Sequence, residues 1–199
     1  MYKKYVKRLL DIAISLPTVV VLCIPMLLVA VFIKLDSKGP VFFRQQRLGK
    51  DGEVFEMLKF RSMYINSEFT GSGVYSDDND VRVTKIGKFL RKTSIDELPQ
   101  LINILRGDMS LIGPRPPLTY HPWPLEEYTD EQRRMFEIRP GITGWAQING
   151  RKDVEWHRRI ELNVWYVDNV SFLLDVKIFF ITILKVLRND DNENKRETV

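Results

Sequence analysis

The stretch LLDIAISLPTVVVLCIPMLLVAVFIKL, residues 9–35, decides where the rest of the chain is placed, because it carries no charge between Ile12 and Ile33. As a straight α-helix, this uncharged part would measure about 33 Å, against a hydrocarbon core of roughly 30 Å. The segment is therefore long enough to cross a membrane.

Two prolines interrupt this apolar segment. Pro17 lies near its start, where a helix tolerates proline, whereas Pro25 lies in the middle and lacks the amide hydrogen that would bond to the carbonyl of Val21. The proline ring also crowds that carbonyl, which usually bends a helix. We therefore expect the chain to bend at Pro25.

Positive charge flanks the apolar segment on both sides, at Lys3, Lys4, Lys7 and Arg8 and again at Lys34, Lys38, Arg44, Arg47 and Lys50. Positive residues mark the cytoplasmic side of a membrane, so both ends are expected on the same side. The sequence thus favours a re-entrant membrane helix over residues 1–36 that enters one leaflet, turns at Pro25 as a hairpin and returns. A spanning helix and a buried core helix remain the alternatives.

Length and composition limit what the remaining chain can be. With 199 residues, the chain is one membrane element plus one globular domain of ordinary size, over residues 37–199. Its net charge of +4 favours anionic partners. The single cysteine, Cys23, lies in the apolar segment, which excludes an internal disulfide and a cysteine-rich zinc site.

Periodicity and turn residues divide the globular part into short elements. Alternating apolar and polar residues around GKDGE predict a β-hairpin within residues 36–63. Residues 66–82 and the proline-dense residues 107–124 are expected to be loops. A strongly apolar helix over residues 170–189 would lie on a membrane surface or pack in the core. Helical patterns also predict helices over residues 83–92, 96–107, 129–138 and 155–169.

The segment TSIDELPQL, residues 93–101, places two carboxylates at a helix start. Ser94 with Glu97 matches a capping box, and Asp96 could be the N-cap instead, so a structural role is the simple interpretation. Adjacent carboxylates can also hold a divalent cation, a carboxylate can itself attack phosphorus, and arginines bind phosphate oxygens. The surroundings favour this phosphoryl chemistry, because basic residues flank the pair at Lys85, Lys88, Arg91, Lys92 and Arg115.

Three blocks of sequence carry a resemblance to a known family. They are KFRSM (residues 59–63), TSIDELPQLINILRGDMSLIGPRP (93–116) and RPGITGWAQINGR (139–151). These blocks, in this order, resemble the signature of the bacterial sugar transferases, the monotopic phosphoglycosyl transferases. The resemblance extends over almost the whole chain, as far as SFLLDVKI at residues 171–178.

The resemblance implies a two-step exchange at the cytoplasmic face of the bacterial inner membrane. Asp96 would attack the β-phosphorus of a UDP-sugar and release UMP. Polyprenol phosphate, undecaprenyl phosphate in bacteria, would then accept the phosphosugar, which initiates glycoconjugate or polysaccharide assembly and passes the product to downstream glycosyltransferases. Mg²⁺, held at Asp96 and Glu97, would neutralise charge on the diphosphate.

The resemblance also implies further site residues. Beside the catalytic Asp96 and Glu97, those expected to bind substrate or phosphate are Lys59, Arg91, Arg115, Arg151 and Asp175. Taken alone, each of the basic residues could equally be a solvated charge or a structural salt bridge.

Two positions depart from the family pattern. Family members often have serine before the helix-breaking proline, where this chain has Ile24, so the bend would depend on Pro25 and its surroundings. The aspartate of the family's ELD is Asn163 here, and an amide keeps a hydrogen bond but supplies no charge. No acidic role is therefore expected at this position.

The expected fold is mixed α/β and mostly helical, with an N-terminal re-entrant membrane helix, interfacial helices and a small β-hairpin. A membrane-tethered, non-enzymatic scaffold is the alternative function, in which the acidic pair only caps a helix. UMP release from UDP-sugars would separate the two. A nucleic-acid partner is not expected, because the sequence has no recognisable binding motif and its basic residues are dispersed.

Overall fold

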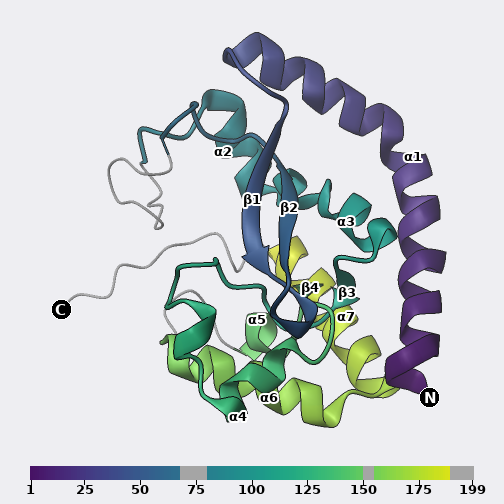
Figure 1. The fold of residues 1–199 in the computed structure, drawn as a ribbon. Coiled ribbons are helices and arrows are strands. Elements are labelled where there is room, and N and C mark those ends of the chain that lie inside the picture. Colours follow the sequence, from purple (N-terminus) through teal and green to yellow (C-terminus); the bar gives the residue numbers. More distant parts are fainter. Residues whose placement is uncertain (68–79, 150–154, 189–199) are drawn as a thin grey trace.

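The computed structural model describes residues 1–67, 80–149 and 155–188. Its fold is mixed α/β and mostly helical, as expected (Figure 1). The helices are α1 (Lys7–Asp36), α2 (Lys85–Lys92), α3 (Gln100–Arg106), α4 (Asp130–Arg133), α5 (Trp145–Asn149), α6 (Trp156–Asn169) and α7 (Phe172–Arg188). The strands are β1 (Phe42–Leu48), β2 (Val54–Phe60), β3 (Ser110–Ile112) and β4 (Gly141–Thr143). Shorter turns lie at Tyr2–Val6, Lys50–Gly52, Ile95–Glu97, Leu125–Glu127 and Arg134–Phe136.

Strands β1 and β2 form the predicted hairpin. They pair antiparallel, with Phe42 opposite Phe60. The 3₁₀ turn Lys50–Gly52 between them uses a positive φ at Asp51 (59°) and at Gly52 (79°). Asp and Gly adopt this backbone conformation more readily than bulky residues, so the GKDGE signal specified the turn correctly.

Strands β3 and β4 form a parallel pair that the sequence did not predict, since β3 lies in the expected proline-dense loop. Gly113 donates its amide hydrogen to the carbonyl of Thr143, and Gly141 donates to that of Pro114. A Cβ atom at Gly141 would lie 2.1 Å from the backbone nitrogen of Gly113, so the two segments approach this closely only as glycines. This pairing brings the residues that precede Arg115 beside the segment that leads into α5.

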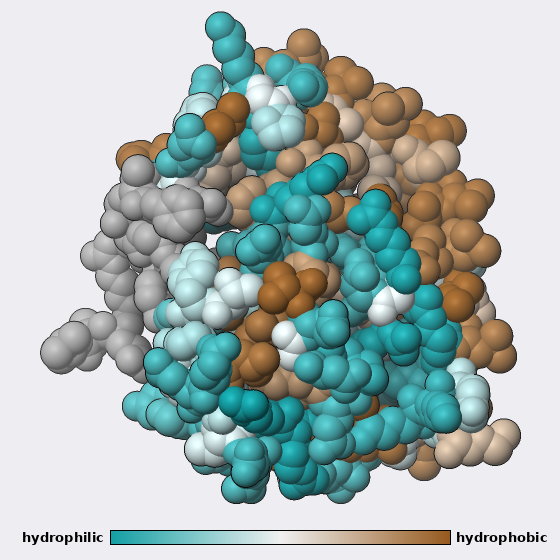
Figure 2. All heavy atoms as spheres, in the orientation of Figure 1, coloured by the Kyte–Doolittle hydropathy of each residue, from teal (hydrophilic) through white to brown (hydrophobic). Residues whose placement is uncertain are grey.

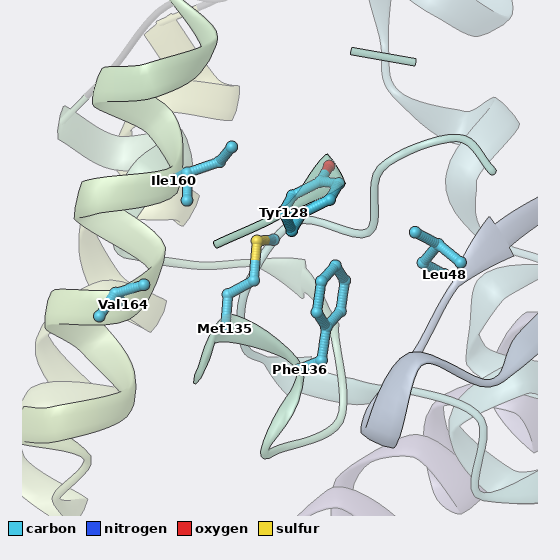
Figure 3. Close-up of a cluster of buried hydrophobic side chains, with 6 residues drawn as sticks. All are labelled: Leu48, Tyr128, Met135, Phe136, Ile160 and Val164. Carbon is cyan, nitrogen blue, oxygen red and sulfur yellow. The ribbon is translucent and has the colours of Figure 1, made fainter. Parts of the chain in front are cut away.

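Apolar clusters hold the hairpin against the helices, two of them against α6 and α3. Figure 3 shows the first, at the turn end of the hairpin, which joins β1 to α6 through Leu48, Tyr128, Met135, Phe136, Ile160 and Val164. The second joins β2 to α3 through Met57, Leu101, Ile104 and Met109. Burying each large apolar side chain contributes roughly 1.5–3 kcal/mol, so these clusters fix α3, and with it the preceding acidic pair, against β2.

The N-terminal end of α1 is attached to the globular part by buried polar side chains. The Lys7 ammonium lies 2.5 Å from the Asp175 carboxylate on α7. The Asp11 carboxylate accepts hydrogen bonds from the Ser110 hydroxyl and the Leu111 amide, each at 3.0 Å. Arg8 adds a hydrogen bond of 2.6 Å to a carbonyl at the end of α3.

The C-terminal end of α1 packs on the other side of the same globular part. Ile33 is fully buried beside Phe60 and Leu90. The guanidinium group of Arg61 donates hydrogen bonds to the carbonyls of Ile33 (3.2 Å) and Ser37 (2.7 Å) as the helix ends. Both ends of α1 therefore contact one globular unit.

Helix α1 runs without a break through Pro17 and Pro25. The predicted hairpin would require the chain to reverse at Pro25, and it does not reverse there. Instead, Figure 1 shows a continuous helix that follows α3 along one side of the molecule and then curves over its top. A curved helix can pack both of its ends on one domain without a hairpin turn.

The outward face of α1 is apolar and exposed. It includes Leu16, Val20, Val21, Ile24, Leu27, Leu28, Val31 and Leu35, all of them exposed. The helical segment Tyr2–Asp36 is long and apolar enough to cross a membrane, and in the described residues it is the one segment with this property. In Figure 2 this surface forms a hydrophobic band along one edge of the molecule. Such a band is typical of a surface that contacts lipid or another apolar partner.

Helix α7 combines the two predicted alternatives. One face is in the core, where Asp175 and Ile178 are buried. The opposite face exposes Leu173, Phe180 and Leu184, which are 78%, 59% and 52% exposed. An apolar face exposed in this way suits a helix that lies in a membrane interface.

Candidate functional site

The acidic pair lies in a 3₁₀ turn, Ile95–Glu97, directly before α3. Ser94, which precedes the turn, has a positive φ of 56°, and its hydroxyl makes no capping hydrogen bond, so the predicted capping box is wrong. The N-cap of α3 is Pro99, and therefore Asp96 does not cap this helix either. Helix capping does not explain either carboxylate.

Apolar packing on both sides of the pair fixes its position. Ile95 and Leu98 pack against the cluster that contains Phe60, and Leu98 also packs against the cluster that contains Met57. Both clusters involve strand β2. The backbone of the turn is therefore anchored to the hairpin immediately before and after the two carboxylates.

Glu97 borders a hollow between the hairpin, the turn and the β3–β4 pair, and this hollow opens to solvent. Lys59, on β2, pairs with Glu97 at 2.6 Å. The hollow is lined by Arg47, Met57, Lys59, Glu97, Gln100, Arg115, Pro116, Gly141, Ile142 and Gln147. Three basic side chains and one carboxylate thus face one space, which suits a phosphate-bearing ligand.

Asp96 is buried, with 8% of its surface exposed. Burial raises the pKa of its carboxyl to about 6, and the positive charges of Lys59 and Arg91 act against this rise, while Glu97 adds to it. In the part of the chain that the structure describes, no other side chain donates a hydrogen bond to this carboxylate. A buried titratable group with a strongly raised pKa is a functional-site candidate.

Glu97 has the opposite electrostatic balance. Burial alone would raise the pKa of its carboxyl, but the charges of Lys59, Arg115 and Arg47 hold the pKa below its ordinary value. Burial, and then repulsion from Arg115, lowers the pKa of the Arg47 guanidinium to about 9. Two neighbouring carboxylates therefore have pKa values pushed apart, which is common where they have different chemical roles.

Arg47 is a site residue that the sequence analysis counted only among the flanking charges. Its side chain donates hydrogen bonds to the Gln45 side chain and to the carbonyl of Pro116 at 3.0 Å. Along β1, Phe43, Gln45 and Arg47 are half-buried, whereas Phe42, Arg44 and Gln46 are exposed, which is the alternation of a strand with one inward face. That period of two, already in the predicted hairpin, is the signal that could have placed Arg47 inward.

The structure brings several predicted residues together and leaves others apart. Lys59 and Arg115 line the hollow with Glu97. Arg91, on α2, donates a hydrogen bond to the Ser62 hydroxyl at 2.9 Å, and its charge acts on Asp96. Arg151 falls outside the described residues.

Asp175 lies apart from the hollow, at the joint between α1 and α7. Its carboxylate accepts hydrogen bonds from the hydroxyls of Tyr2 (2.6 Å) and Tyr166 (2.5 Å) and from Lys7 (2.5 Å). Asp175 is not one of the described residues that line the hollow. In this structure Asp175 therefore joins helices, and its predicted contact with substrate stays a prediction.

Asn163, one of the two departures from the family pattern, contacts the backbone of the segment that carries Arg115. It is buried on α6, and its side-chain oxygen accepts a hydrogen bond from the backbone amide of Arg115 at 3.2 Å. An amide oxygen makes this bond without any charge. Asn163 therefore positions the segment that carries Arg115.

The acidic pair has donor chemistry that fits Mg²⁺. This cation binds one or two protein carboxylates and takes its other ligands from water and substrate phosphates. Asp96 supplies a carboxylate with no side-chain donor in the described chain, and Glu97 supplies an oxygen beyond the one that pairs with Lys59. No group of three or more potential metal-binding side chains occurs in the described ranges, so a metal here would also need ligands from substrate.

Comparison with known proteins adds to this geometry. A family model described as "Bacterial sugar transferase" matches residues 2–189. The chain belongs to the bacterial sugar transferase family. The resemblance that the three sequence blocks predicted is thereby confirmed.

Several relatives are similar over most of this chain. The "Uncharacterized sugar transferase EpsL" of Bacillus subtilis (strain 168) is 46% identical over 91% of this chain and 87% of the relative. A UDP-glucose:undecaprenyl-phosphate glucose-1-phosphate transferase of Escherichia coli (strain K12) is 42% identical over 92% of this chain but 40% of the relative. A UDP-N-acetylgalactosamine-undecaprenyl-phosphate N-acetylgalactosaminephosphotransferase of Aeromonas hydrophila is 43% identical over 92% of this chain and 44% of the relative. The chain thus spans most of the first relative and less than half the length of the other two.

Proposed function

We propose that this protein transfers a sugar phosphate from a UDP-sugar to undecaprenyl phosphate and releases UMP. The names of the Escherichia coli and Aeromonas hydrophila relatives support this class of reaction. The observation that carries the proposal is Asp96, a buried carboxylate with a raised pKa beside Arg91 and Lys59. Such a group is poised to act as a nucleophile near bound phosphate.

In the first step, a carboxylate oxygen of Asp96 attacks the β-phosphorus of the UDP-sugar. The new O–P bond forms as the bond between that phosphorus and the bridging oxygen breaks, and UMP leaves with the electron pair. A pKa of about 6 makes the carboxylate more basic than usual, while leaving it mostly ionised above pH 7. Arg91 and Lys59 offset the negative charge of the reacting phosphates.

In the second step, an oxygen of undecaprenyl phosphate attacks the same phosphorus. The O–P bond to Asp96 breaks, which restores the carboxylate and yields a polyprenyl diphosphate sugar. The carboxylate of Glu97, the second one at the site, pairs with Lys59 at 2.6 Å and lies next to the nucleophile. Mg²⁺ bound at Asp96 and Glu97 would neutralise charge on the diphosphate oxygens. Downstream glycosyltransferases would then extend this lipid-linked sugar in glycoconjugate or polysaccharide assembly.

The proposed location is the cytoplasmic face of the bacterial inner membrane, with α1 inserted in one leaflet. Support comes from the contacts of Lys7 with Asp175 at one end of α1 and of Ile33 with Phe60 at the other. A straight crossing would place the two ends about 45 Å apart on opposite sides. One domain that packs on both ends keeps them on one side, and the positive flanks favour the cytoplasmic side.

Thiol labelling tests this topology. Lys4 is exposed, so we choose a Lys4→Cys variant in a Cys23→Ser background and a membrane-impermeant reagent on cells with an intact inner membrane. We expect no labelling from outside until the membrane is permeabilised. Adding Pro25→Ala should increase outside labelling, because it restores an amide donor and favours a straighter helix. Outside labelling with Pro25 in place would contradict the one-leaflet topology.

UMP release tests the reaction. The purified protein, with Mg²⁺ and undecaprenyl phosphate, should release UMP from one or more of UDP-glucose, UDP-galactose and UDP-N-acetylgalactosamine. With the UDP-sugar alone, intact-mass analysis and peptide mapping should find a phosphosugar adduct on Asp96. An adduct on another residue would reassign the nucleophile, and a folded protein that releases no UMP would favour the scaffold alternative.

A further inference from the structure

Gln147 is a polar side chain of the hollow that the steps described above do not use. Gln147, on α5, lines the hollow together with Glu97 and Arg115. Both its side-chain nitrogen and its side-chain oxygen are buried, and in the described chain neither has a hydrogen-bond partner. Buried polar groups in native proteins are nearly always hydrogen-bonded, so an amide with both atoms unpaired needs an explanation.

The backbone around Gln147 fixes this arrangement. Its backbone nitrogen donates a hydrogen bond of 3.1 Å to the carbonyl of Gly144, the residue that precedes α5. A Cβ atom at Gly144 would lie 2.0 Å from the carbonyl oxygen of Gly113, so α5 can approach the Arg115 segment this closely only with glycine there. The fold thus brings an unpaired amide to the wall of the hollow.

The chemistry of Gln147 differs from that of its neighbours. Arg47, Lys59 and Arg115 are positive and suit phosphate oxygens, whereas a carboxamide is neutral and presents one donor and one acceptor side by side. Rotating the side-chain amide by 180° exchanges the positions of its oxygen and its nitrogen. The matching ligand group is therefore neutral and carries a donor and an acceptor on nearby atoms.

We propose that Gln147 binds a neutral donor-and-acceptor edge of the nucleotide sugar and so contributes to substrate specificity. This inference rests on the proposed function. In a UDP-sugar, two parts have this chemistry, the imide edge of the uracil base and a pair of neighbouring sugar hydroxyls. A site built to hydrogen-bond such a group discriminates strongly against ligands that lack it, because its own polar atoms are then left unpaired.

Calorimetry on the full chain in nanodiscs tests this inference. An Asp96→Asn background prevents turnover, and the probes are UMP, UDP-glucose, UDP-galactose and UDP-N-acetylgalactosamine. Gln147→Met keeps the volume of the side chain but removes both polar atoms, and should weaken binding of the accepted UDP-sugar by about tenfold or more. Asn149→Ala, at an exposed position on the same helix, is the matched control and should leave binding unchanged.

The two sources of the neutral edge give different results. If Gln147 contacts the base, Gln147→Met lowers the affinity for UMP and for the UDP-sugar by similar factors. If Gln147 contacts the sugar, the variant binds the UDP-sugar more weakly but binds UMP with the parental affinity. Equal binding of every probe by Gln147→Met and its parent would overturn the inference. Failure of the parent to bind any probe would instead contradict the proposed function.

Thermal unfolding without ligand separates binding from a structural role. Because the Gln147 amide has no partner in the described chain, Gln147→Met should melt no lower than its parent. A lower melting temperature together with unchanged binding would identify a structural residue and overturn the inference. Gln147→Asn provides a second variant, which keeps the amide but withdraws it by one carbon, and should weaken binding less than Gln147→Met.

Discussion

Two aspartates, Asp96 and Asp175, are buried to nearly the same extent but have opposite surroundings. Asp96 is 8% exposed and Asp175 is 6% exposed. The carboxylate of Asp175 accepts hydrogen bonds from Tyr2, Lys7 and Tyr166 at 2.5–2.6 Å. In the described part of the chain, no other side chain donates to Asp96. Burial alone therefore does not distinguish the two residues, whereas their hydrogen-bond partners do.

The difference in hydrogen-bond donors distinguishes a carboxylate that stabilises the fold from one that is available for a reaction. A buried carboxylate with a full set of donors is stabilised in its charged form, and Asp175 uses those donors to attach α1 to α7. A buried carboxylate without donors costs free energy in the absence of ligand and keeps its oxygens available to a substrate or a cation. We therefore expect Asp96 and Asp175 to respond to substitution in opposite ways.

The largest expected effect is the loss of activity in Asp96→Asn. An amide has the same shape as the carboxylate but cannot attack phosphorus, and removing a nucleophile commonly lowers the rate by several orders of magnitude. We expect UMP release to fall at least about 10³-fold while the protein stays folded. The measurement is initial UMP release at saturating UDP-sugar, with circular dichroism as the check on folding.

Glu97→Gln sharpens this first prediction. It removes the charge that pairs with Lys59 but leaves Asp96 in place, so UMP release should fall severely without being abolished. The covalent adduct on Asp96 should still form, more slowly. Near-normal UMP release by Asp96→Asn would rule out Asp96 as the nucleophile and would remove the contrast with Asp175.

The next effect is the loss of stability in Asp175→Ala. This change leaves the Lys7 ammonium buried without its counter-charge, which typically costs about 3–5 kcal/mol. Two tyrosine hydroxyls lose their acceptor as well. Chemical unfolding should report this loss, and hydrogen exchange should show faster exchange at the start of α1.

A control for Asp175→Ala is available on α6. Asp168 pairs with Arg134 on the surface, and both side chains are more than 40% exposed. Exposed pairs contribute little, so Asp168→Ala should cost less than about 1 kcal/mol. Equal losses for the two variants would show that the Lys7–Asp175 pair does not hold α1.

Local sequence signals predicted the parts of the fold that depend on local chemistry. The GKDGE turn specified the hairpin, and helical spacing predicted α2 and α6 close to their observed limits. Over residues 129–138, the helix ends early and continues as the 3₁₀ turn Arg134–Phe136. Strand β3 was missed because its three residues pair with β4 about thirty positions later, and such non-local pairing leaves no periodic pattern in so short a segment.

The candidate site was predicted only in part for a similar reason. The resemblance named Lys59, Glu97 and Arg115, and the structure brings these three to one hollow. Gln147 was not singled out, because its unpaired amide is a property of the packed structure. Asp175 was expected to bind substrate or phosphate, and its contact with Lys7 at the joint between α1 and α7 was not predicted, since Lys7 lies far away in the chain. Distant partners of this kind are set by topology.

A smaller effect concerns the stability of Asp96→Asn. Burial raises the pKa of Asp96 from 3.8 to about 6, so the folded state binds more protons than the unfolded state between these values, and stability falls as pH rises through this window. Above about pH 6 the full penalty is present, whereas below 3.8 it is absent. Without Mg²⁺ and nucleotide, Asp96→Asn should therefore be more stable than the parent by up to about 3 kcal/mol at pH 7.5.

The pH dependence is the decisive part of this measurement. The stability difference between Asp96→Asn and its parent should shrink toward zero as the pH is lowered to 4, because the parent then carries a neutral carboxyl too. Unfolding curves at pH 4 and pH 7.5 give the two values. A difference that does not depend on pH would mean that the carboxylate of Asp96 is not penalised in the folded state.

The smallest effect comes from removing one donor of Asp175 while leaving the others. Tyr166→Phe deletes a buried hydroxyl that donates at 2.5 Å, whereas Tyr2→Phe deletes a less buried one that donates at 2.6 Å to the other oxygen. Hydrogen bonds to charged groups contribute about 1.5–3 kcal/mol when one partner is lost from a buried site, so Tyr166→Phe should lie at the lower end and Tyr2→Phe below it. UMP release should stay near the parental rate in both variants, because their hydroxyls stabilise a helix joint and not the hollow. A large loss of UMP release with unchanged stability would give Asp175 and its donors a direct part in the reaction, and the two buried aspartates would then differ less than their hydrogen bonds indicate.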